Sequence, residues 1–440
     1  MANWLTQHLY VVYFLPLLLL WGLYARYHQK LASRATAIRD ANIAAGMDQP
    51  ASLHPIVDPS VCIGCAACVN ACPESNVLGL IEGKAELISP ANCIGHGACK
   101  QACPVGGIEL VFGTAQRGVE LPVIAPNFES TVPGVYIAGE LGGMGLVRNA
   151  IEQGKQAVAE IASQKDRFSK QRLNLVIVGA GPAGIASGLM ARSLGLSYRI
   201  LEQDSLGGTV AHFPRKKLVM TAPVVLPIVG KMNFRETSKE ALMEYWSEIV
   251  AEQQLPISTN QRVDAIENNG DCGFVVTTPE ENIECSTVLL CLGRRGTPRK
   301  LGVQGEDSSK VVYRLVDARQ YAGQHVLVVG GGDSALEAAL AVADEAGTLV
   351  ALSYRSNSFS RAKPKNREKI QRSVEQKEVV VYFESEVKKI EDERVVLSTP
   401  SGEQLLRNDT VIVCVGGVLP TSFLKSTGIE VATHYGAAQT

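Results

Sequence analysis

The sequence has almost no net charge. Its 42 Lys and Arg residues are balanced by 44 Asp and Glu residues, which leaves a formal charge of −2 at pH 7. Nucleic-acid-binding domains carry a clustered excess of basic residues, so this balance gives no indication of such a partner. The 440 residues contain no low-complexity tract, and their hydrophobic content of 46% is sufficient for packed cores. This length corresponds to about three domains.

A Cys-x-x-Cys pair is absent from the second half of the chain. Eleven cysteines are present, and four of them are scattered at Cys272, Cys285, Cys291 and Cys414. Their spacing provides no dithiol motif. Unpaired cysteines argue against an oxidising compartment, where extracellular proteins form disulfides.

The other seven cysteines lie in two runs with one spacing. The first run reads Cys-x2-Cys-x2-Cys-x3-Cys-Pro, and the second repeats it with a histidine in the second position. The first is formed by Cys62, Cys65, Cys68 and Cys72, and the second by Cys93, His96, Cys99 and Cys103. Zinc sites and disulfide knots rarely show two interleaved runs that each end in Cys-Pro. The pattern is the signature of bacterial dicluster ferredoxins.

The segment from Cys62 to Pro104 therefore resembles a dicluster ferredoxin domain. The resemblance implies two 4Fe–4S clusters, because the fourth cysteine of each run ligates the cluster of the other run. One ligand set would be Cys62, Cys65, Cys68 and Cys103. The other would be Cys72, Cys93, His96 and Cys99.

His96 leaves the second ligand set open. Ligation of iron is the favoured interpretation, since histidine ligates iron and raises the potential in Rieske centres. Two alternatives are a 3Fe–4S cluster that lacks this corner, and a histidine that only lies near the cluster.

The N-terminal run Leu9–Ala25 is uncharged and has about the minimum length of a membrane-spanning helix, near 17 residues. Aromatic residues lie towards its two ends, at Tyr10, Tyr13, Trp21 and Tyr24. Basic residues follow the run instead of preceding it, at Arg26, Lys30, Arg34 and Arg39. This order predicts an uncleaved, single-pass anchor in the cell inner membrane, with the remaining domains in the cytoplasm. Because Pro16 interrupts the run, a helix lying in the membrane interface is the alternative.

Two segments have the pattern of a dinucleotide-binding unit, in which a strand, a glycine-rich turn, a helix and a second strand follow one another. In the first, Gly179, Gly181 and Gly184 form the turn, and the acid Glu202 ends the second strand. In the second, the small positions are Gly330, Gly332 and Ala335. No acid ends its second strand; Arg355 and Arg361 follow, which suits a 2′-phosphate and favours NADPH over NADH. Solvated surface arginines are the alternative.

From about residue 117 onward the chain resembles the two-dinucleotide-fold flavoprotein disulfide reductases, in the thioredoxin-reductase-like branch. The segment from Leu206 to Trp246 is closer to the bacillithiol disulfide reductases. The resemblance implies FAD on the first unit, with the turn at Gly207, Gly208 and Thr209 near the flavin, and a nicotinamide nucleotide on the second. The dithiol of thioredoxin reductases is absent here.

The order of segments departs from this family. The family's closing strand and helix normally come last, but the matching sequence VPGVYIAGE lies at Val132–Glu140, before the first dinucleotide unit. We interpret this order as a circular permutation. The resemblance then places Gly139 and Glu140 at the FAD, although the family has aspartate at the second position.

The expected fold is α/β, with two Rossmann-like domains, a small α+β dicluster ferredoxin domain and an N-terminal transmembrane helix. The expected ranges are 1–30 for the anchor, 31–55 for a helical stalk, 56–116 for the ferredoxin-like domain, 117–298 for the FAD domain (closing segment 131–162, completed by 413–440) and 299–412 for the NAD(P)H domain.

The expected function is transfer of electrons from NADPH through FAD to the clusters and on to a quinone or a redox partner protein. No side chain is expected to act as an acid–base catalyst. A homodimer is an assembly that the sequence allows, and no nucleic-acid partner is expected. The alternatives are a thiol or low-molecular-weight disulfide reductase, and a redox-sensing subunit without turnover.

Overall fold

The computed structural model describes residues 9–45, 47–50, 53–74, 76–143, 145–164, 168–169, 171–215, 217–270, 273–294, 296–359 and 362–436. The first eight residues of the expected anchor lie outside this range. The chain divides into two compact units, one formed by Met1–Arg117 with Tyr435–Thr440 and the other by Gly118–His434.

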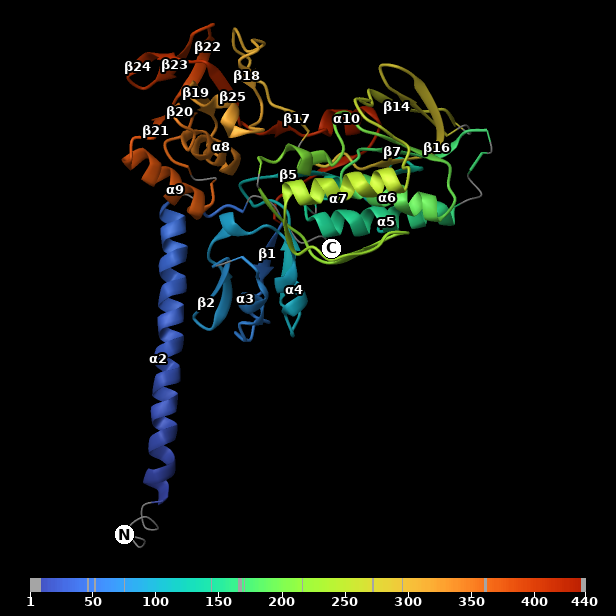
Figure 1. Ribbon diagram of the computed structural model, residues 1–440. Coiled ribbons are helices and arrows are strands. Elements are labelled where there is room, and N and C mark those ends of the chain that lie inside the picture. Colours follow the sequence, from blue (N-terminus) through green and yellow to red (C-terminus); the bar gives the residue numbers. More distant parts are fainter. Residues whose placement is uncertain are drawn as a thin grey trace. The chain divides into compact units, whose positions relative to one another are not determined.

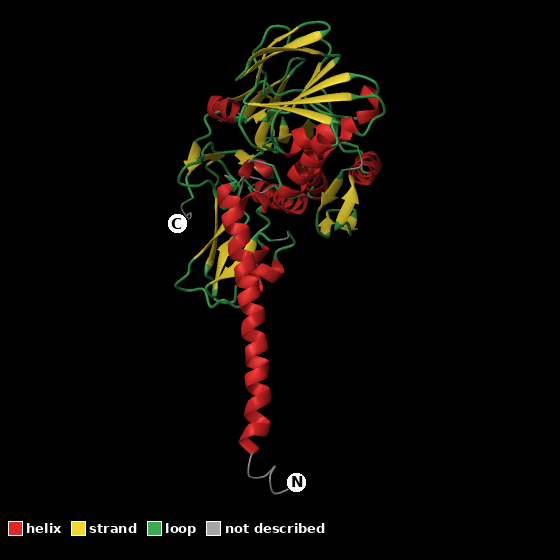
Figure 2. Cartoon of the chain, turned by 90° about the vertical axis from the view of Figure 1, so that its left-hand side faces the viewer, coloured by secondary structure: helices red, strands yellow, loops and turns green. Residues whose placement is uncertain are grey.

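The first unit begins with a single long helix, α2 (Leu9–Ala44), which Figure 2 shows as one continuous rod. Pro16 lies in its second turn, and neither proline nor glycine occurs between Gly22 and the helix end. The expected anchor and stalk are therefore parts of one helix, because nothing in the sequence breaks it at residue 30.

The second half of α2 packs on the ferredoxin-like fold. Ala35 contacts Ile81 and Ile88 in a small apolar cluster. The side-chain amide of Asn42 donates to the carbonyl of Ile88 at 2.8 Å, and Arg39 forms an ion pair with Glu86 at 2.9 Å. The segment expected to be a free stalk is thus part of the folded unit.

The first half of α2 carries exposed apolar side chains. Ten large hydrophobic residues between Phe14 and Tyr27 are 56–68% exposed. Among the residues that the structure describes, no helix has an apolar stretch long enough to cross a membrane. The expected transmembrane helix is therefore not supported by the structure.

The cysteine runs lie on two similar halves of a small α+β fold. Its elements are β1 (His54–Val57), α3 (Ala67–Ala71), β2 (Leu78–Ile81), β3 (Lys84–Leu87), η1 (Pro90–Asn92), α4 (Ala98–Ala102) and β4 (Ile108–Val111). β1 pairs with β4 and β2 with β3, both antiparallel. The residues before α3 and α4, Ala66 and Gly97, share a left-handed backbone (φ 59° and 79°). Each run therefore turns into its short helix in the same way.

The second unit contains a seven-stranded sheet in the order β13-β8-β7-β16-β15-β14, with β6 beside β16. Figure 1 labels β7, β14 and β16 of this sheet. Its strands are β6 (Val135–Ile137), β7 (Leu173–Val178), β8 (Tyr198–Leu201), β13 (Ile257–Ser258), β14 (Ala265–Asn268), β15 (Phe274–Thr277) and β16 (Asn282–Leu290). The neighbours β13, β8, β7 and β16 are parallel. The last four residues of β7, 175–178, are all apolar and buried, as expected of a parallel strand covered on both faces.

The displaced closing segment belongs to this sheet. β6 runs parallel to the end of β16, with Val288 opposite Val135. The following helix α5 (Val147–Ser163) packs on α6 (Pro182–Ser193), the helix of the first dinucleotide unit. Gly154 allows this close approach, because a Cβ there would lie 2.4 Å from the carbonyl oxygen of Ala183. The structure thus confirms that the closing segment packs on the first dinucleotide unit, as the permutation predicts.

A second parallel sheet has the order β18-β25-β19-β20-β21. It comprises β18 (Val311–Val312), β19 (His325–Val329), β20 (Leu349–Tyr354), β21 (Val379–Phe383) and β25 (Thr410–Val413), with α8 (Asp333–Ala343) and α9 (Pro364–Glu375) packed against it. A three-stranded antiparallel sheet adjoins it, formed by β22 (Glu386–Ile390), β23 (Arg394–Thr399) and β24 (Gly402–Arg407).

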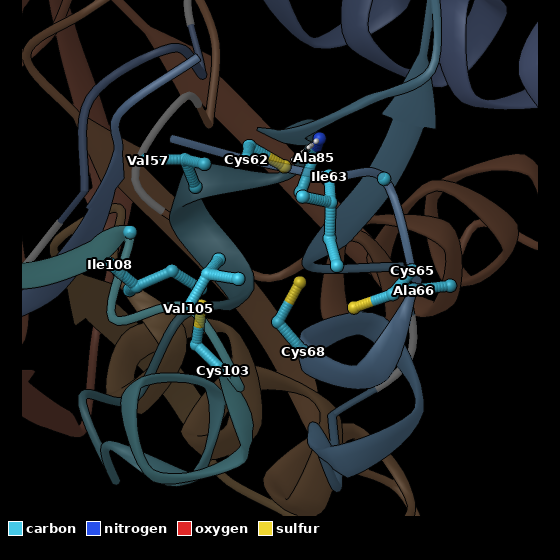
Figure 3. A pocket seen from close by; sticks show the side chains of 12 residues that line it. Val57, Cys62, Ile63, Cys65, Ala66, Cys68, Ala85, Cys103, Val105 and Ile108 are labelled. Atoms are coloured by element: carbon cyan, nitrogen blue, oxygen red, sulfur yellow. Dashed lines mark hydrogen bonds between the residues drawn. The ribbon is translucent and has the colours of Figure 1, made fainter. Parts of the chain in front are cut away.

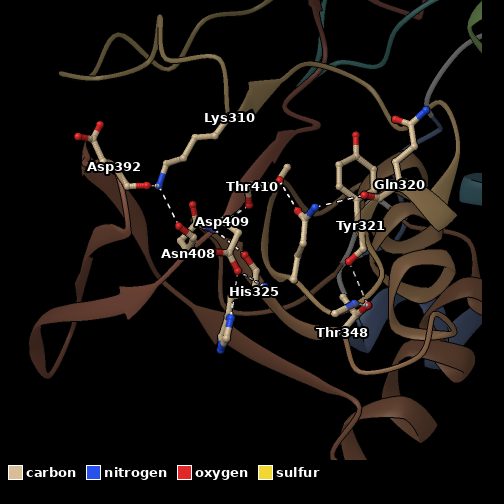
Figure 4. A network of polar contacts seen from close by, with 11 residues as sticks. Lys310, Gln320, Tyr321, His325, Thr348, Asp392, Asn408, Asp409 and Thr410 are labelled. Atoms are coloured by element: carbon tan, nitrogen blue, oxygen red, sulfur yellow. Dashed lines mark hydrogen bonds and ion pairs between the residues drawn. The ribbon is translucent and has the colours of Figure 1, made fainter.

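The amino-terminal edge of this second sheet is held by a polar network (Figure 4). The ammonium of Lys310 donates to the carbonyls of Asp392 and Asn408 at 3.1 Å. The backbone N–H of His325 donates to Asp409 at 2.7 Å, and this bond holds the pKa of the Asp409 carboxyl below its usual value. The network joins the first residues of neighbouring strands, and it lies at the edge opposite the glycine turn that follows β19.

The end of the chain returns to the first sheet. The segment holds β26 (Gly417–Val418), α10 (Thr421–Ser426) and β27 (Val431–His434). Leu424 and Ile429 are buried in the core that also contains Val135 of β6. β27 pairs antiparallel with β5 (Val119–Pro122), so the two ends of the unit form one ladder.

The remaining elements connect these sheets. They are η2 (Glu140–Gly142), η4 (Gly208–His212), β9 (Leu218–Met220), β10 (Val224–Leu226), β11 (Gly230–Met232), β12 (Glu236–Ser238), α7 (Lys239–Glu252), β17 (Thr297–Pro298) and η6 (Ala318–Tyr321).

The α5–α6 contact generates a first prediction. Gly154→Ala should lower the free energy of unfolding by about 1–3 kcal/mol, because the added methyl overlaps the backbone of α6. Gln156→Ala, at an exposed position of the same helix, is the matched control and should have little effect. Thermal unfolding measures both. Equal midpoints for the two variants would contradict the observed packing.

Candidate functional site

The first cysteine run borders a hollow of about 320 Å³ (Figure 3). Four sulfurs lie on its wall, from Cys62, Cys65, Cys68 and Cys103, and apolar residues such as Val57 and Ile108 complete the lining. The backbone N–H of Ala85 donates to the sulfur of Cys62 at 3.5 Å.

A second hollow of about 290 Å³ contains the other predicted donors. These are Cys72, Cys93, His96 and Cys99. Burial raises the pKa of the Cys93 thiol to about 11. The structure therefore groups the eight residues into the same two sets that the ferredoxin resemblance implies.

The arrangement fits cluster chemistry. In a 4Fe–4S cube each thiolate binds a different iron, so the ligands surround a volume instead of converging on one point. Among the described residues, no three His, Cys, Asp or Glu side chains come together to hold a single ion. Burial also raises the pKa values of Cys68 and Cys99, so binding of iron must displace their protons.

His96 has a defined orientation in the second hollow. Its Nδ1 accepts a hydrogen bond from the backbone N–H of Ala98 at 3.0 Å. Its Nε2 lies 3.7 Å from the sulfur of Cys72. Burial lowers the pKa of the His96 imidazole, which favours its neutral form, although the charge of Glu74 acts in the opposite direction.

The FAD site predicted from the sequence is assembled from three glycine turns. Gly179, Gly181 and Gly184 form the turn between β7 and α6, and Gly181 is the residue before that helix. A Cβ on Gly208 would lie 3.1 Å from the Cα of Gly181, so these two turns touch. Gly139 lies beside Ala183 in the first turn of α6. A helix leaves its first N–H groups without intrahelical partners, which suits a pyrophosphate at this position.

Glu202 ends β8 and points back to the first turn. Its carboxylate accepts hydrogen bonds from the backbone N–H groups of Ala180 at 2.7 Å and Asp204 at 3.0 Å. Burial raises the pKa of Glu202, and these hydrogen bonds partly offset that effect. The acid therefore stands at the position where such folds bind a ribose hydroxyl.

Two residues beside Glu140, Gly293 and Arg294, were not singled out from the sequence. The carboxyl of Glu140 faces Gly293, and its pKa is raised by burial and lowered in part by the charge of Arg294. Thr209 also lies next to Gly293. The one sequence feature that could have indicated these residues is the glycine-containing turn after β16. Its proximity to Glu140 could not be read from spacing, because Glu140 lies in the displaced segment. All the residues predicted for FAD are thus gathered around α6.

The second dinucleotide unit repeats this turn, but a tyrosine replaces the acidic residue at the end of the second strand. The N–H of Gly330 bonds to the carbonyl of Ser353, as that of Gly179 does to Leu201, so Tyr354 corresponds to Glu202. The ring of Tyr354 covers Gly331, where a Cβ would lie 2.4 Å from it. Gly332 begins α8, and Ala335 is buried beneath the turn. Arg355 is exposed, whereas Arg361 lies outside the described residues.

The cysteines outside the clusters are poorly suited to thiol chemistry. Cys285 and Cys291 are buried, and burial raises the pKa of each thiol to about 12. Cys414 is half-buried, and Cys272 lies outside the described residues. A nucleophilic cysteine needs an accessible thiolate, which Cys285 and Cys291 do not provide.

These features define an oxidoreductase with two dinucleotide-binding domains and a separate unit for two iron–sulfur clusters. Comparison with protein families agrees. Residues 176–438, more than half of the chain, match the pyridine nucleotide-disulphide oxidoreductase model, and residues 54–104 match a 4Fe-4S dicluster domain model. The chain belongs to the pyridine nucleotide-disulphide oxidoreductase family.

Similar proteins cover this same part of the chain. Bacilliredoxin reductase Bdr of Bacillus subtilis is 24% identical over 59% of this chain and 82% of its own length. A ferredoxin–NADP reductase of Thermus thermophilus is 29% identical over 58% of this chain and 76% of its own length. Among solved structures, bacillithiol disulfide reductase Bdr of Staphylococcus aureus has a TM-score of 0.52 at 24% identity, over 60% of this chain and 85% of its own. This structural similarity shows that the two proteins share a fold over this region.

The chain is therefore an FAD-dependent NAD(P)H oxidoreductase that carries a 4Fe–4S dicluster domain. The residues around α6 would hold the FAD, the turn before α8 would hold the nicotinamide nucleotide, and the two hollows would hold the clusters.

Proposed function

We propose that this protein passes electrons from NADPH through FAD to its two 4Fe–4S clusters and on to a membrane or protein acceptor. One observation carries the proposal: a single polypeptide contains two nucleotide turns and two hollows lined by the cysteines predicted to bind clusters. When bound, FAD exchanges a hydride with a nicotinamide and single electrons with other carriers. The protein residues bind and orient the carriers.

The relatives named ferredoxin–NADP reductase support the choice of acceptor. Their name pairs a ferredoxin with NADP. In this chain a ferredoxin-type domain precedes the oxidoreductase domains in the same polypeptide. The clusters are thus a tethered electron acceptor, and an external partner or a quinone would take the electrons next.

A disulfide reductase is the second candidate function, since one relative is named bacilliredoxin reductase. The high thiol pKa values of Cys285 and Cys291, about 12, argue against reactive thiols at those positions. A redox-sensing subunit is the third candidate, and it would bind the nucleotides without turnover.

We further propose that NADPH is preferred over NADH. The position of Glu202 is occupied by Tyr354 in the second unit, so no carboxylate there would repel a 2′-phosphate. Arg355 follows directly and is exposed to solvent. Arg361 follows in the sequence and would supply a second positive charge.

Attachment to the cytoplasmic face of the inner membrane is also proposed. It rests on the exposed apolar side chains between Phe14 and Tyr27. Basic residues follow this stretch, and such residues interact with anionic lipid headgroups. Arg39 is engaged elsewhere, in its ion pair with Glu86, so Arg26, Lys30 and Arg34 are the basic residues available for the membrane.

The electron route predicts the behaviour of cluster variants. In the variant Cys62→Ser/Cys65→Ser, NADPH should still reduce the flavin, but reduction of cytochrome c should be abolished because one cluster cannot assemble. Stopped-flow spectroscopy and steady-state assays measure the two effects. The matched control replaces Cys272, Cys285, Cys291 and Cys414 by alanine, and it should retain cytochrome c reduction. Full activity of the cluster variant, or a folded and flavin-loaded but inactive control, would refute the electron-transfer function.

Cofactor preference tests the two arginines. The variant Arg355→Ala/Arg361→Ala should show a KM for NADPH raised by about 10- to 100-fold, because the two charges together would contribute about 1.4–2.8 kcal/mol to binding of the 2′-phosphate, and each 1.4 kcal/mol is a factor of ten. The KM for NADH should stay unchanged, since NADH lacks the 2′-phosphate. An unaltered NADPH preference would mean that both arginines are only solvated surface residues.

Membrane attachment predicts binding to lipid vesicles. The full chain should float with vesicles of phosphatidylethanolamine and phosphatidylglycerol in a density gradient. Leu17→Lys/Leu20→Lys should abolish flotation, because charges are costly at apolar lipid contacts. Leu349→Lys/Leu405→Lys is the matched control, since these leucines are similarly exposed (60% and 63%) on the other unit. Flotation that survives the first variant, or is lost in the second, would contradict the assignment to α2.

A further inference from the structure

The second hollow contains a histidine whose role is decided by its hydrogen bonds. His96 occupies the position that Cys65 has in the first run, and the backbone is the same at both. Left-handed residues flank each, with φ of 69° and 59° around Cys65 and of 73° and 79° around His96. The chain therefore presents both side chains to their hollows in the same manner.

The position of the His96 ring is closely constrained. Gly95 packs on the preceding segment, where a Cβ would lie 2.7 Å from the carbonyl oxygen of Leu53. Gly97 packs on Leu110, which would lie 3.2 Å from a Cβ. The backbone on both sides of His96 is thus closely packed, and the ring places Nδ1 at the start of α4 and Nε2 towards Cys72.

The hydrogen bond at the start of α4 fixes the tautomer. A backbone N–H can only donate, so Nδ1, which receives the N–H of Ala98 at 3.0 Å, carries no proton. In a neutral imidazole the single proton is then on Nε2. A nitrogen that carries a proton has no lone pair for iron, because a neutral histidine offers one acceptor nitrogen only.

The Nε2–H group faces a sulfur that is itself a predicted cluster ligand. The distance from Nε2 to the sulfur of Cys72 is 3.7 Å, within the range of a hydrogen bond to sulfur. The backbone N–H of Glu74 also donates to this sulfur. A thiolate bound to iron keeps partial negative charge, which such donors stabilise.

We infer that His96 is not an iron ligand but a hydrogen-bond donor, through Nε2–H, to the cluster-ligating sulfur of Cys72. The second cluster then has three protein ligands, Cys72, Cys93 and Cys99. His96 acts as a positioning residue that raises the reduction potential of this cluster, since hydrogen bonds to sulfur favour the more negative reduced state. The inference refines the ligand set expected from the sequence, and it rests on the proposed clusters but not on the route of electrons to them.

Magnetic spectroscopy separates the two roles directly. The full-length protein, loaded with FAD and clusters and labelled with ¹⁵N-histidine, is reduced by dithionite, so that NADPH and the flavin are not needed. Pulsed electron paramagnetic resonance should show only weak nitrogen coupling to the second cluster. Strong coupling, as from a nitrogen bound to iron, would overturn the inference.

Substitutions provide a second, independent measurement. His96→Gln retains an N–H donor, and it should keep iron content and the potential of the second cluster near those of the wild type. His96→Leu should keep the same iron content but shift that potential to a more negative value. The first cluster should be unchanged in both variants and serves as the internal control for folding.

The outcomes distinguish the roles. If His96→Gln and His96→Leu lose iron from the second cluster equally, His96 is a ligand and the inference fails. If neither variant shifts the potential, the contact between His96 and Cys72 has no influence on the cluster and the inference also fails. Neither result affects the proposed electron transfer, which the cysteine variants test separately.

Discussion

Each nucleotide turn depends on a close approach of two backbone segments between neighbouring parallel strands. Gly179 follows β7 with a φ of 108°, and a Cβ there would lie 2.4 Å from the carbonyl oxygen of Cys291. Gly330 follows β19 with a φ of 140°, and its Cβ would lie 2.4 Å from the carbonyl oxygen of Cys414. Only glycine tolerates both the conformation and the contact. Each dinucleotide turn therefore packs against the residue that follows a neighbouring strand, Cys291 after β16 and Cys414 after β25.

The same two strands explain why the cysteines after them are structural. Cys291 directly follows β16, and its backbone supports the first turn while its side chain lies beside Ser187 of α6. Cys414 follows β25 and supports the second turn. Their role in packing needs no thiol chemistry, which separates them from the cluster cysteines, whose side chains line the two hollows.

Sequence patterns predicted the features that depend on local spacing. The two cysteine runs, the glycine turns with Glu202, and the displaced strand at Val135–Ile137 were all placed correctly relative to the elements around them. Features that depend on distant residues were not predicted. The ion pair of Arg39 with Glu86 joins α2 to the ferredoxin-like fold, and no local pattern indicates it. The proximity of Gly293 to Glu140 and the correspondence of Tyr354 to Glu202 also required the folded sheets, since spacing alone does not fix side-chain neighbours.

The ladder between β5 and β27 has a consequence for gene architecture. It sets Val119 opposite His434, so the first and last residues of the larger unit are adjacent although nearly the whole oxidoreductase lies between them. The chain then returns to the smaller unit, where the N–H of Gly436 bonds to the carbonyl of Phe112. The oxidoreductase unit is therefore flanked in the sequence on both sides by residues of the smaller unit. Because the two ends of this unit are adjacent, a short linker could replace the whole unit in the chain. The unit could equally be inserted into a surface loop of another protein without separating the two ends of that loop.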